Sequence, residues 1–391
     1  MHYPSFTVKI KSMKQDIAIT YNPILPNAVD EICSKLPLAD SYIAIIFFAS
    51  VNYDFQELSS RLKERYPDSE VIGCSTSGEI INGDGFVQHT IVVTALSCSR
   101  TWVSGVLINN VEKFNIFGVK TVEDAAHKIG INPGSPDCHK DAFALTFVNG
   151  LCNAEETLTA LFYAIIKNED FILAGGSAGD DLQFKKTYVS YNGTVTTEGA
   201  VILFVRTQCK FDIRKENLFT PIGKLMKITE ADIHTRKIIS IDGEVPLKRY
   251  AEVLEISENE VNNAQLVYPF GRRLYGDMYI SSIAGFNEDG TMNMYCKVAS
   301  GAFVELLKEG EIAKIAEETC KSISENIPKP SAVILVNCIL RTIYFNQKSL
   351  VKDVLERFDR YFPKYCGFSS YGEQFGRFNC NQTLVSIVIG E

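Results

Sequence analysis

A short motif of glycine and serine occurs three times in this chain, each time after a buried strand and an amphipathic helix. Its three copies are GCSTSGE (73–79), GGSAGDD (175–181) and GFSSYGE (367–373). The strands that precede them are short, continuous apolar runs rich in β-branched and aromatic residues, at 42–50, 142–150 and 331–339. Runs of this kind are typical of strands that are buried on both faces. The repetition therefore predicts several layered sheets.

The segment between each strand and its motif has helical periodicity. In the first copy, Phe55, Leu58 and Leu62 fall on one face and charged residues fall on the other. A further buried strand follows each motif, so the repeats span about 41–97, 141–207 and 331–390. We expect a mixed α/β (α+β) fold, in which repeated β-α-β units form layered sheets with the helices outside.

The chain is long enough for two or three domains. Residues 98–140 and 208–330 separate the repeats and are interpreted as inserts; the second is β-rich, with a hairpin signal at Asp289-Gly290. We place a boundary near residue 215. The predicted two-part architecture is a domain of two repeats (1–215), followed by a domain with the β-rich insert and the third repeat (216–391).

Composition disfavours several function classes. The net charge is -8 and no basic run is present, which disfavours a nucleic-acid partner. No apolar stretch is long enough to cross a membrane, and the N-terminus lacks the features of a secretory signal. Eleven scattered cysteines without a CxxC pair indicate buried thiols in a reducing cytoplasm. The five histidines have no metal-ligand spacing, so neither a metal site nor a cofactor is expected.

The motifs superpose as Gly-x-Ser followed by glycine and an acid. Copies one and three end in Gly78-Glu79 and Gly372-Glu373, and copy two ends in Gly179-Asp180 if one residue is omitted. A carboxylate stands where a phosphate-binding loop would carry lysine, which excludes that interpretation. The glycines may be read in two ways: as exposing backbone N–H groups to a ligand, or as closing tight turns with the acids as caps.

With its motifs in this order, the chain resembles the FIST (F-box and intracellular signal transduction) family. The likeness rests on IGCSTSGEI (72–80), AGGSAGDD (174–181), TPIGKLMKIT (220–229), VNCILR (336–341), GFSSYGE (367–373) and NQTLV (381–385). It covers nearly the whole chain. The resemblance implies N-terminal and C-terminal FIST parts and a cytoplasmic sensory module that binds small polar ligands such as amino acids. The chain shows no output domain, so a signalling partner is expected to be encoded separately.

A ligand with both charges would suit acid-ended turns. Glu79, Asp180 or Glu373 would bind an ammonium group, and backbone N–H groups with an arginine would bind a carboxylate. Arg341 is the first choice for that arginine and Arg272 the second. The full set of predicted ligand-binding residues is Gly73, Ser75, Ser77, Gly78, Glu79, Gly176, Ser177, Asp180, Arg341, Ser369, Tyr371, Gly372, Glu373 and Asn381.

Two other functions compete with sensing. GGSAG (175–179) fits the G-x-S-x-G nucleophile elbow, which would make Ser177 the nucleophile of a serine hydrolase. The segment after it reads as strand and turn instead of the required helix, and the only downstream histidine is His234. We therefore expect no catalytic residue. The remaining alternative is an interaction scaffold whose repeats only build a core.

Overall fold

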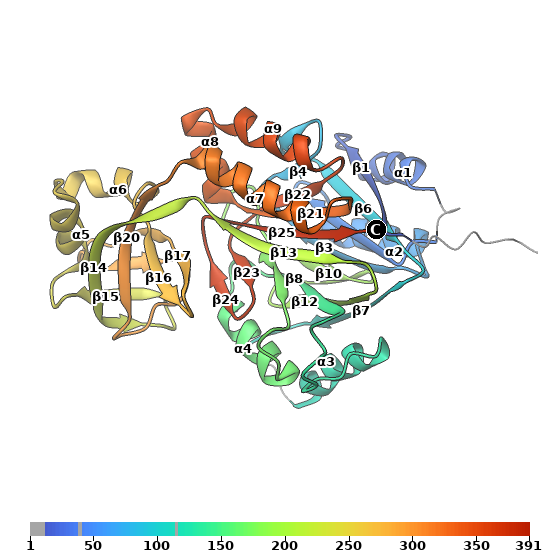
Figure 1. The fold of residues 1–391 in the computed structure, drawn as a ribbon, viewed down its shortest axis with the longest axis horizontal. Helices are drawn as coiled ribbons and strands as arrows, with labels where there is room; N and C mark the ends of the chain where they lie inside the picture. The colour runs from blue at the N-terminus through green and yellow to red at the C-terminus, as the bar shows by residue number, and fades with distance from the viewer. Residues whose placement is uncertain (1–11, 38–40, 114–115) are drawn as a thin grey trace, which may run out of the picture.

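The computed structural model of the chain describes residues 12–37, 41–113 and 116–391. Of the described residues, helices make up 26% and strands 39%. In the described part, the strands form three six-stranded sheets and one seven-stranded sheet, and the helices cover them from outside (Figure 1). The predicted mixed α/β class is confirmed.

The first repeat supplies the simplest of the six-stranded sheets. Its strands β2 (Ala44–Ala49) and β3 (Glu70–Ser75) are parallel and are joined by α2 (Phe55–Arg65), which Asp54 caps through the backbone N–H of Glu57. Strand β6 (Ile91–Ser97) pairs antiparallel with β2, and β1 (Lys14–Thr20) pairs antiparallel with β6 at the edge of the sheet. The remaining helix, α1 (Leu25–Lys35), buries its apolar face against the same sheet.

The second repeat has the same order of elements. It consists of β7 (Thr101–Ile108), α3 (Ile116–Lys128), β8 (Ala142–Val148), α4 (Glu155–Ile166), β9 (Leu173–Ser177) and β12 (Ala200–Thr207). Residues 98–140, interpreted from the sequence as an insert, thus supply β7 and α3, which correspond to β1 and α1. That interpretation was wrong because the edge strand of each unit pairs with a strand far away in the chain.

The third repeat is interrupted by the β-rich insert. Its elements are β13 (Phe211–Asn217), α7 (Ile312–Asn326), β21 (Pro330–Cys338), α8 (Ile339–Lys348), α9 (Val351–Tyr361), β22 (Cys366–Ser370) and β25 (Thr383–Gly390). The sequence predicts one helix over 347–362, whereas the structure has two, with Ser349 in the left-handed conformation between them. The boundary proposed at 215 falls within β13 and stays a prediction.

Each motif is followed by a hairpin that leaves its own repeat. Hairpin β4 (Glu79–Ile81)–β5 (Gly85–Val87) pairs with β22, β23 (Glu373–Phe375)–β24 (Phe378–Cys380) pairs with β9, and β10 (Val189–Tyr191)–β11 (Thr194–Thr196) pairs with β3. The hairpin after the first motif thus completes the sheet of the third repeat. The hairpin after the third motif completes the sheet of the second repeat, and the hairpin after the second motif completes the sheet of the first repeat. This cyclic exchange locks the three repeats into one body.

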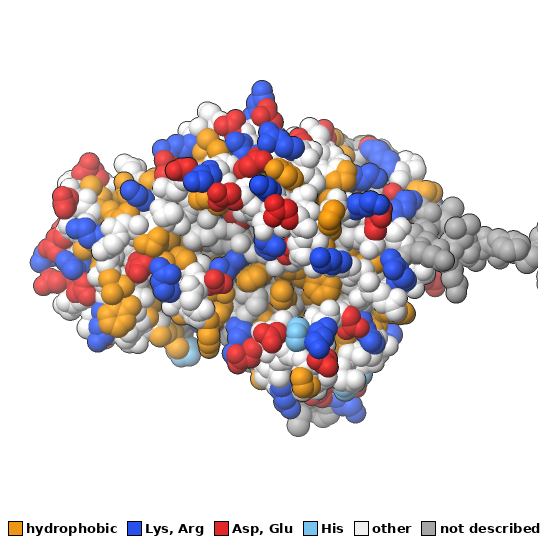
Figure 2. All heavy atoms as spheres, viewed as in Figure 1, with side chains coloured by type: hydrophobic (Ala, Val, Ile, Leu, Met, Phe, Trp, Pro, Cys, Tyr) orange, Lys and Arg blue, Asp and Glu red, His pale blue; other side chains and the backbone are white. Residues whose placement is uncertain are grey.

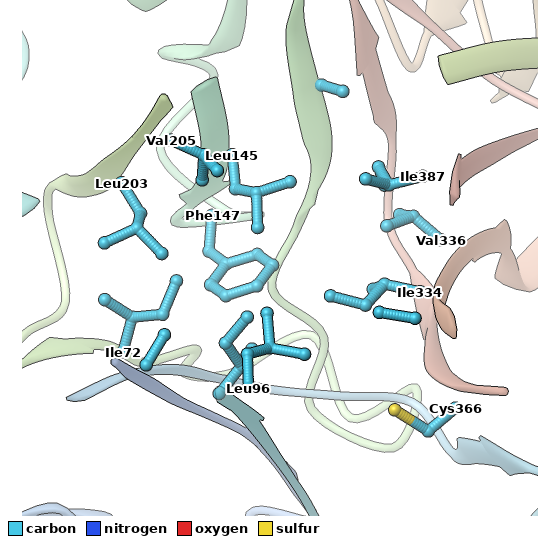
Figure 3. Packing of buried hydrophobic residues seen from close by; sticks show 14 of the residues in the cluster. Ile72, Leu96, Leu145, Phe147, Leu203, Val205, Ile334, Val336, Cys366 and Ile387 are labelled. Carbon is cyan, nitrogen blue, oxygen red and sulfur yellow. The ribbon is translucent and has the colours of Figure 1, made fainter. Parts of the chain in front are cut away.

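The three sheets enclose a common core. Side chains of all three sheets meet there, among them Ile72, Leu145, Phe147 and Val336 (Figure 3). At its centre the rings of Phe48, Phe147 and Phe368 contact one another, with centroids 4.9–5.7 Å apart. Buried aromatic clusters of this kind contribute strongly to stability, because each ring removes a large apolar area from water.

The insert lies between β13 and α7 and forms its own seven-stranded sheet at one end of the molecule (Figure 1). It contains β14 (Phe219–Asp232), β15 (Lys237–Ile241), α5 (Pro246–Leu254), α6 (Val261–Ala264), β16 (Phe270–Leu274), β17 (Asp277–Ser281), β18 (Ile283–Phe286), β19 (Met292–Met294) and β20 (Phe303–Glu309). The hairpin predicted at Asp289-Gly290 joins β18 and β19. Figure 2 shows acidic and basic side chains intermixed on the visible face of the insert and the repeats.

Candidate functional site

The three motifs meet at the centre of the molecule through a ring of backbone hydrogen bonds. The N–H of Ser77 donates to the carbonyl of Ser369 (3.1 Å), that of Tyr371 donates to Ser177 (3.0 Å), and that of Gly179 donates to Ser75 (2.9 Å). In each case the fifth residue of one motif binds the third residue of the next motif.

The ring fixes how the motifs align. Because Ser77, Gly179 and Tyr371 are equivalent donors, the copies superpose without a gap. Asp181 then corresponds to Glu79 and Glu373, whereas Asp180 takes the place of Gly78 and Gly372. The sequence-based alignment, which matched Gly179-Asp180 with Gly78-Glu79 by placing a one-residue gap in the second copy, is thus corrected. Asp181 accepts a hydrogen bond from the hydroxyl of Ser50 at 2.6 Å.

Glu79 and Glu373 are fully buried at the bases of two exchanged hairpins. Glu79 accepts from the hydroxyls of Thr76 and Thr90. Glu373 accepts from the hydroxyl of Ser370 at 2.6 Å and from the N–H of Thr383 at 3.3 Å. Burial raises the pKa of both carboxyls to about 8, although these hydrogen bonds oppose the shift. Their contacts close turns, as the second interpretation of the motifs expects.

The two arginines proposed for a ligand carboxylate already have partners inside the protein. Arg341, at the start of α8, is 1% exposed and binds the carboxylate of Glu216 (2.6 Å) and the side-chain oxygen of Asn337 (2.9 Å). Arg272 donates to Ser281 at 2.7 Å and to the carbonyl of Lys297 at 3.1 Å. Neither lines the cavity described next.

A partly open cavity of about 380 Å³ lies beside the ring of motifs. Seven of its lining side chains are apolar: Leu151, Leu182, Phe184, Met294, Ile339, Leu340 and Ile343. Gly150, Asn153, Glu155, Arg236, Tyr295 and Tyr371 complete the lining. Of the predicted ligand-binding residues, Tyr371 alone lines this cavity. The others are buried and do not line it: Gly73, Ser75, Ser77, Gly78, Glu79, Gly176, Ser177, Asp180, Arg341, Ser369, Gly372, Glu373 and Asn381.

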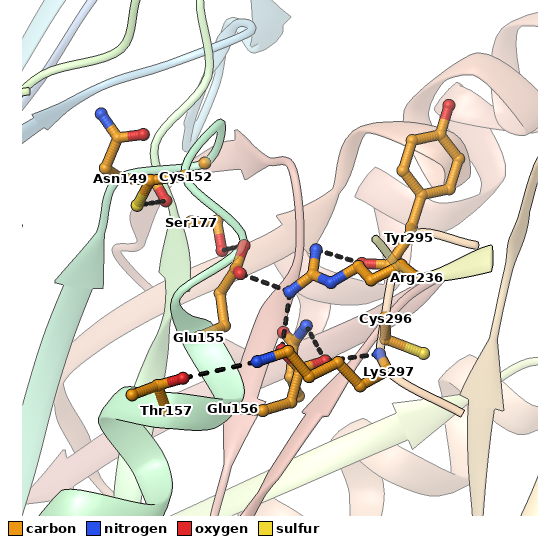
Figure 4. Close-up of polar contacts among 12 residues, drawn as sticks. Asn149, Cys152, Glu155, Glu156, Thr157, Ser177, Arg236, Tyr295, Cys296 and Lys297 are labelled. Atoms are coloured by element: carbon orange, nitrogen blue, oxygen red, sulfur yellow. Dashed lines mark hydrogen bonds and ion pairs between the residues drawn. The ribbon is translucent and has the colours of Figure 1, made fainter. Parts of the chain in front are cut away.

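Two charged residues in the wall of this mainly apolar cavity, Arg236 and Glu155, form an ion pair (Figure 4). Arg236 Nη2 lies 2.6 Å from Glu155 Oε2 and 2.6 Å from Glu156 Oε2, and Nη1 donates to the carbonyl of Tyr295 at 2.8 Å. Burial acts against the charge of Arg236, but the two carboxylates raise its pKa above the usual value. The Nε–H of Arg236 is buried and has no hydrogen-bond partner.

Ser177 connects the ring to the cavity wall. Its hydroxyl donates to Glu155 Oε1 at 3.0 Å and accepts from the side-chain amide of Gln374 at 3.2 Å. The second connection is Tyr371, whose hydroxyl donates to the Asp180 carboxylate and whose ring stacks on Phe184 with centroids 5.1 Å apart. The motifs therefore position the cavity's polar wall instead of forming it.

Arg236 and Glu155 were not foreseen from the sequence. Arg236 is the last residue of the turn between β14 and β15, and an arginine in a polar hairpin gives no signal of burial. Glu155 and Glu156 begin α4, a position where acids favour the helix dipole without any ligand. Only the fold brings the insert's hairpin to the start of this helix.

Comparison with known families finds both parts that the resemblance implies. The FIST N domain matches residues 43–244 and the FIST C domain matches residues 246–376. The chain belongs to the FIST family. FIST domains are recognised as sensory signal-transduction domains, which confirms the resemblance seen in the sequence. Residues of both matched regions line the cavity: Glu155 and Arg236 lie in the first, and Tyr295 and Tyr371 in the second.

This FIST protein is also similar to an uncharacterized protein of Methanocaldococcus jannaschii. The two are 23% identical over 383 residues, which cover 88% of this chain and 73% of the relative. Among the described residues of the FIST chain, no helix has the length and apolar character needed to cross a membrane.

Proposed function

We propose that this FIST protein senses a small zwitterion, an amino acid with an apolar side chain, in the cavity between its two FIST regions. The observation that carries the proposal is the Arg236–Glu155 ion pair inside an otherwise mainly apolar cavity. Its volume of about 380 Å³ lies within the range of roughly 300–1,000 Å³ that is usual for small-molecule pockets. Apolar walls with a few convergent polar groups are the common design of such pockets.

Each end of an amino acid has a suitable partner in this cavity. The unpartnered Nε–H of Arg236 would donate to the ligand's carboxylate. Glu155 would bind the ammonium group by exchanging part of its contact with Arg236. The apolar side chain would lie against Leu151, Ile339 and Ile343. The ligand thereby exchanges part of the Arg236–Glu155 ion pair for two charge-assisted contacts of its own, and no charge is left unpaired.

The walls of the cavity come from three parts of the chain, which gives the protein a way to transmit a signal. A ligand held by Arg236 of the insert, Glu155 of the second repeat and Ile339 of the third favours one arrangement of these three parts over others. We propose that a separately encoded signalling protein reads this arrangement in the cytoplasm. The eleven cysteines all lie in described segments and none is in a disulfide, which supports a reducing compartment.

The test is a thermal-shift screen of the twenty L-amino acids, followed by calorimetric titration of every compound that stabilises the protein. A ligand at 100 times its dissociation constant adds about 2.7 kcal/mol to the free energy of unfolding. Glu155→Gln is expected to weaken binding at least about tenfold, since it removes the acceptor for the ammonium group. Arg273→Met, at an exposed arginine of the same insert, is the matched control and should bind normally.

Two results would contradict the proposal. The first is the absence of binding by all twenty amino acids to the wild-type protein. The second is undiminished binding by both Glu155→Gln and Arg236→Lys, because the ligand would then lie elsewhere. Circular dichroism of each variant at the titration temperature shows whether it is folded.

A further inference from the structure

The segment from Asp181 to Thr187 is where the second copy departs from the threefold pattern. In the first and third copies, Ile80 and Gln374 pair with a motif glycine seven residues after the motif begins. In the second copy, the equivalent pairing residue is Ser190, fifteen residues after Gly175. The extra residues form a loop on the rim of the cavity, to which they contribute Leu182 and Phe184.

This loop exposes apolar side chains at the cavity. Leu182 is 40% exposed and Phe184 is 53% exposed, although both line the cavity. Large apolar side chains that are about half exposed at the rim of an apolar cavity become more buried if a ligand fills the space beneath them.

The backbone of the loop is strained. Asp181, Leu182 and Phe184 have φ values of 53°, 61° and 53°, in the left-handed region that residues other than glycine rarely adopt. Such conformations persist only where surrounding contacts maintain them, and they are common in segments that move. Asp180 supplies these contacts: its carboxylate accepts from the N–H groups of Phe184, Lys185 and Lys186 at 2.6–2.9 Å.

Both ends of the loop are fixed to the body. At one end, the N–H of Asp181 donates to the carbonyl of Thr76 at 3.1 Å. At the other, Thr187 binds Asn149 and Gly150 through its carbonyl and hydroxyl, at 3.0 and 3.2 Å. The tip between these anchors, from Leu182 to Lys186, is exposed to solvent.

We propose that residues 181–187 form a lid that closes over the occupied cavity. This inference rests on the proposed function and adds its regulation. In the open state, Phe184 stacks on Tyr371, which is held by Asp180. An apolar ligand side chain offers Leu182 and Phe184 a new surface, so they turn inward about the fixed ends. Closure changes the outer surface formed by Gln183, Lys185 and Lys186. Binding of a ligand in the cavity would thus alter a surface that a partner protein can contact.

A single-tryptophan variant reports lid closure directly. The chain contains one tryptophan, Trp102, which is 44% exposed on β7. In the variant Trp102→Phe/Phe184→Trp, the only indole lies on the lid. L-leucine, L-isoleucine, L-methionine and L-phenylalanine are titrated, with glycine as the control that lacks an apolar side chain. Acrylamide quenching and the emission maximum measure the exposure of the indole, and calorimetry of the wild-type protein measures binding.

The expected result is a fall of at least about twofold in the quenching constant, with a blue shift that saturates together with the calorimetric heat. Binding with unchanged quenching overturns the lid and leaves the proposed function intact. Failure of all twenty L-amino acids to bind the wild-type protein overturns both.

A second variant keeps the test valid if the indole itself blocks binding. Leu182→Ser/Phe184→Ser removes two exposed side chains, so folding is preserved. Its affinity should fall roughly tenfold or more, mainly through faster dissociation in stopped-flow measurements, because the lost apolar contacts form after binding. An affinity equal to that of the wild type overturns the lid.

Discussion

The hydroxyl of Ser177 donates to Glu155 Oε1 at 3.0 Å, and the other oxygen of that carboxylate binds Arg236 at 2.6 Å. A serine of the repeated motif is thus joined through one side chain to the charged wall of the cavity. Glu155 is 3% exposed and Arg236 is 6% exposed, so this chain of contacts is shielded from water. The repeats and the insert therefore share a buried electrostatic link.

We predict that Arg236→Met lowers the free energy of unfolding by about 3–5 kcal/mol. The substitution leaves the buried carboxylate of Glu155 without its cation, and an unpaired buried charge is costly. Urea unfolding followed by circular dichroism measures the change. The double variant Glu155→Gln/Arg236→Met should recover part of the loss, because both charges are then removed. Additive losses in the double variant would contradict a direct coupling between the two residues.

The buried acids of the motifs predict a stability that falls with rising pH. Burial raises the pKa of Glu79 and Glu373 to about 8 in the folded protein, compared with 4.5 for an ordinary glutamate. Between these values the folded state binds more protons than the unfolded chain does. The free energy of unfolding should therefore decrease from pH 5 to pH 8, by on the order of 1 kcal/mol per pH unit for each group.

Glu79→Gln tests this dependence because glutamine cannot titrate. Relative to the wild type, this variant should gain stability between pH 6 and pH 8, because folding of the wild type must then take up a proton that its unfolded chain has already released. Urea titrations at both pH values supply the comparison, and Glu64→Gln on the exposed face of α2 is the control. The same difference between variant and wild type at both pH values would show that Glu79 stays ionised in the fold.

The ring of motifs predicts a severe effect of enlarging Gly179. A Cβ atom at this position would lie 2.8 Å from the backbone nitrogen of Ser77 and 2.9 Å from the carbonyl carbon of Thr76. Gly179→Ala should therefore lower the free energy of unfolding by about 3 kcal/mol, at the upper end of overpacking effects. Gly134→Ala is the control: φ is 82° there, but the space is open, and about 1 kcal/mol is expected. Equal losses in thermal or urea unfolding would refute the close approach of the motifs.

Local pattern was enough to predict the fold class and the internal repeat. Strands expected at 42–50, 142–150 and 331–339 form β2, β8 and β21. These elements have strong apolar periodicity, which depends on the neighbouring residues alone. The family was also recognised correctly from the order of its motifs.

The exchange of hairpins could not be predicted, because alternation along a strand does not identify its partner. Ile80 pairs with Gly367 across most of the chain, and no local signal favours that partner over a nearby strand. The cavity depends on the same distant contacts. Tyr371 was identified from its motif, whereas Arg236 enters the site only because the insert's hairpin reaches α4.

The environment of Ser177 predicts that a fluorophosphonate probe will not label it. Its hydroxyl is fully buried and is bound by Glu155 and Gln374. A nucleophilic serine needs a base that can accept its proton, and the carboxylate of Glu155 is also engaged by the guanidinium of Arg236. Histidine, the usual base, is not among the hydrogen-bond partners of Ser177 in the described structure. Incubation with the probe followed by peptide mass spectrometry decides the question, with chymotrypsin as the positive control. Labelling that disappears in Ser177→Ala would make the chain a hydrolase and would replace the sensory interpretation of this motif.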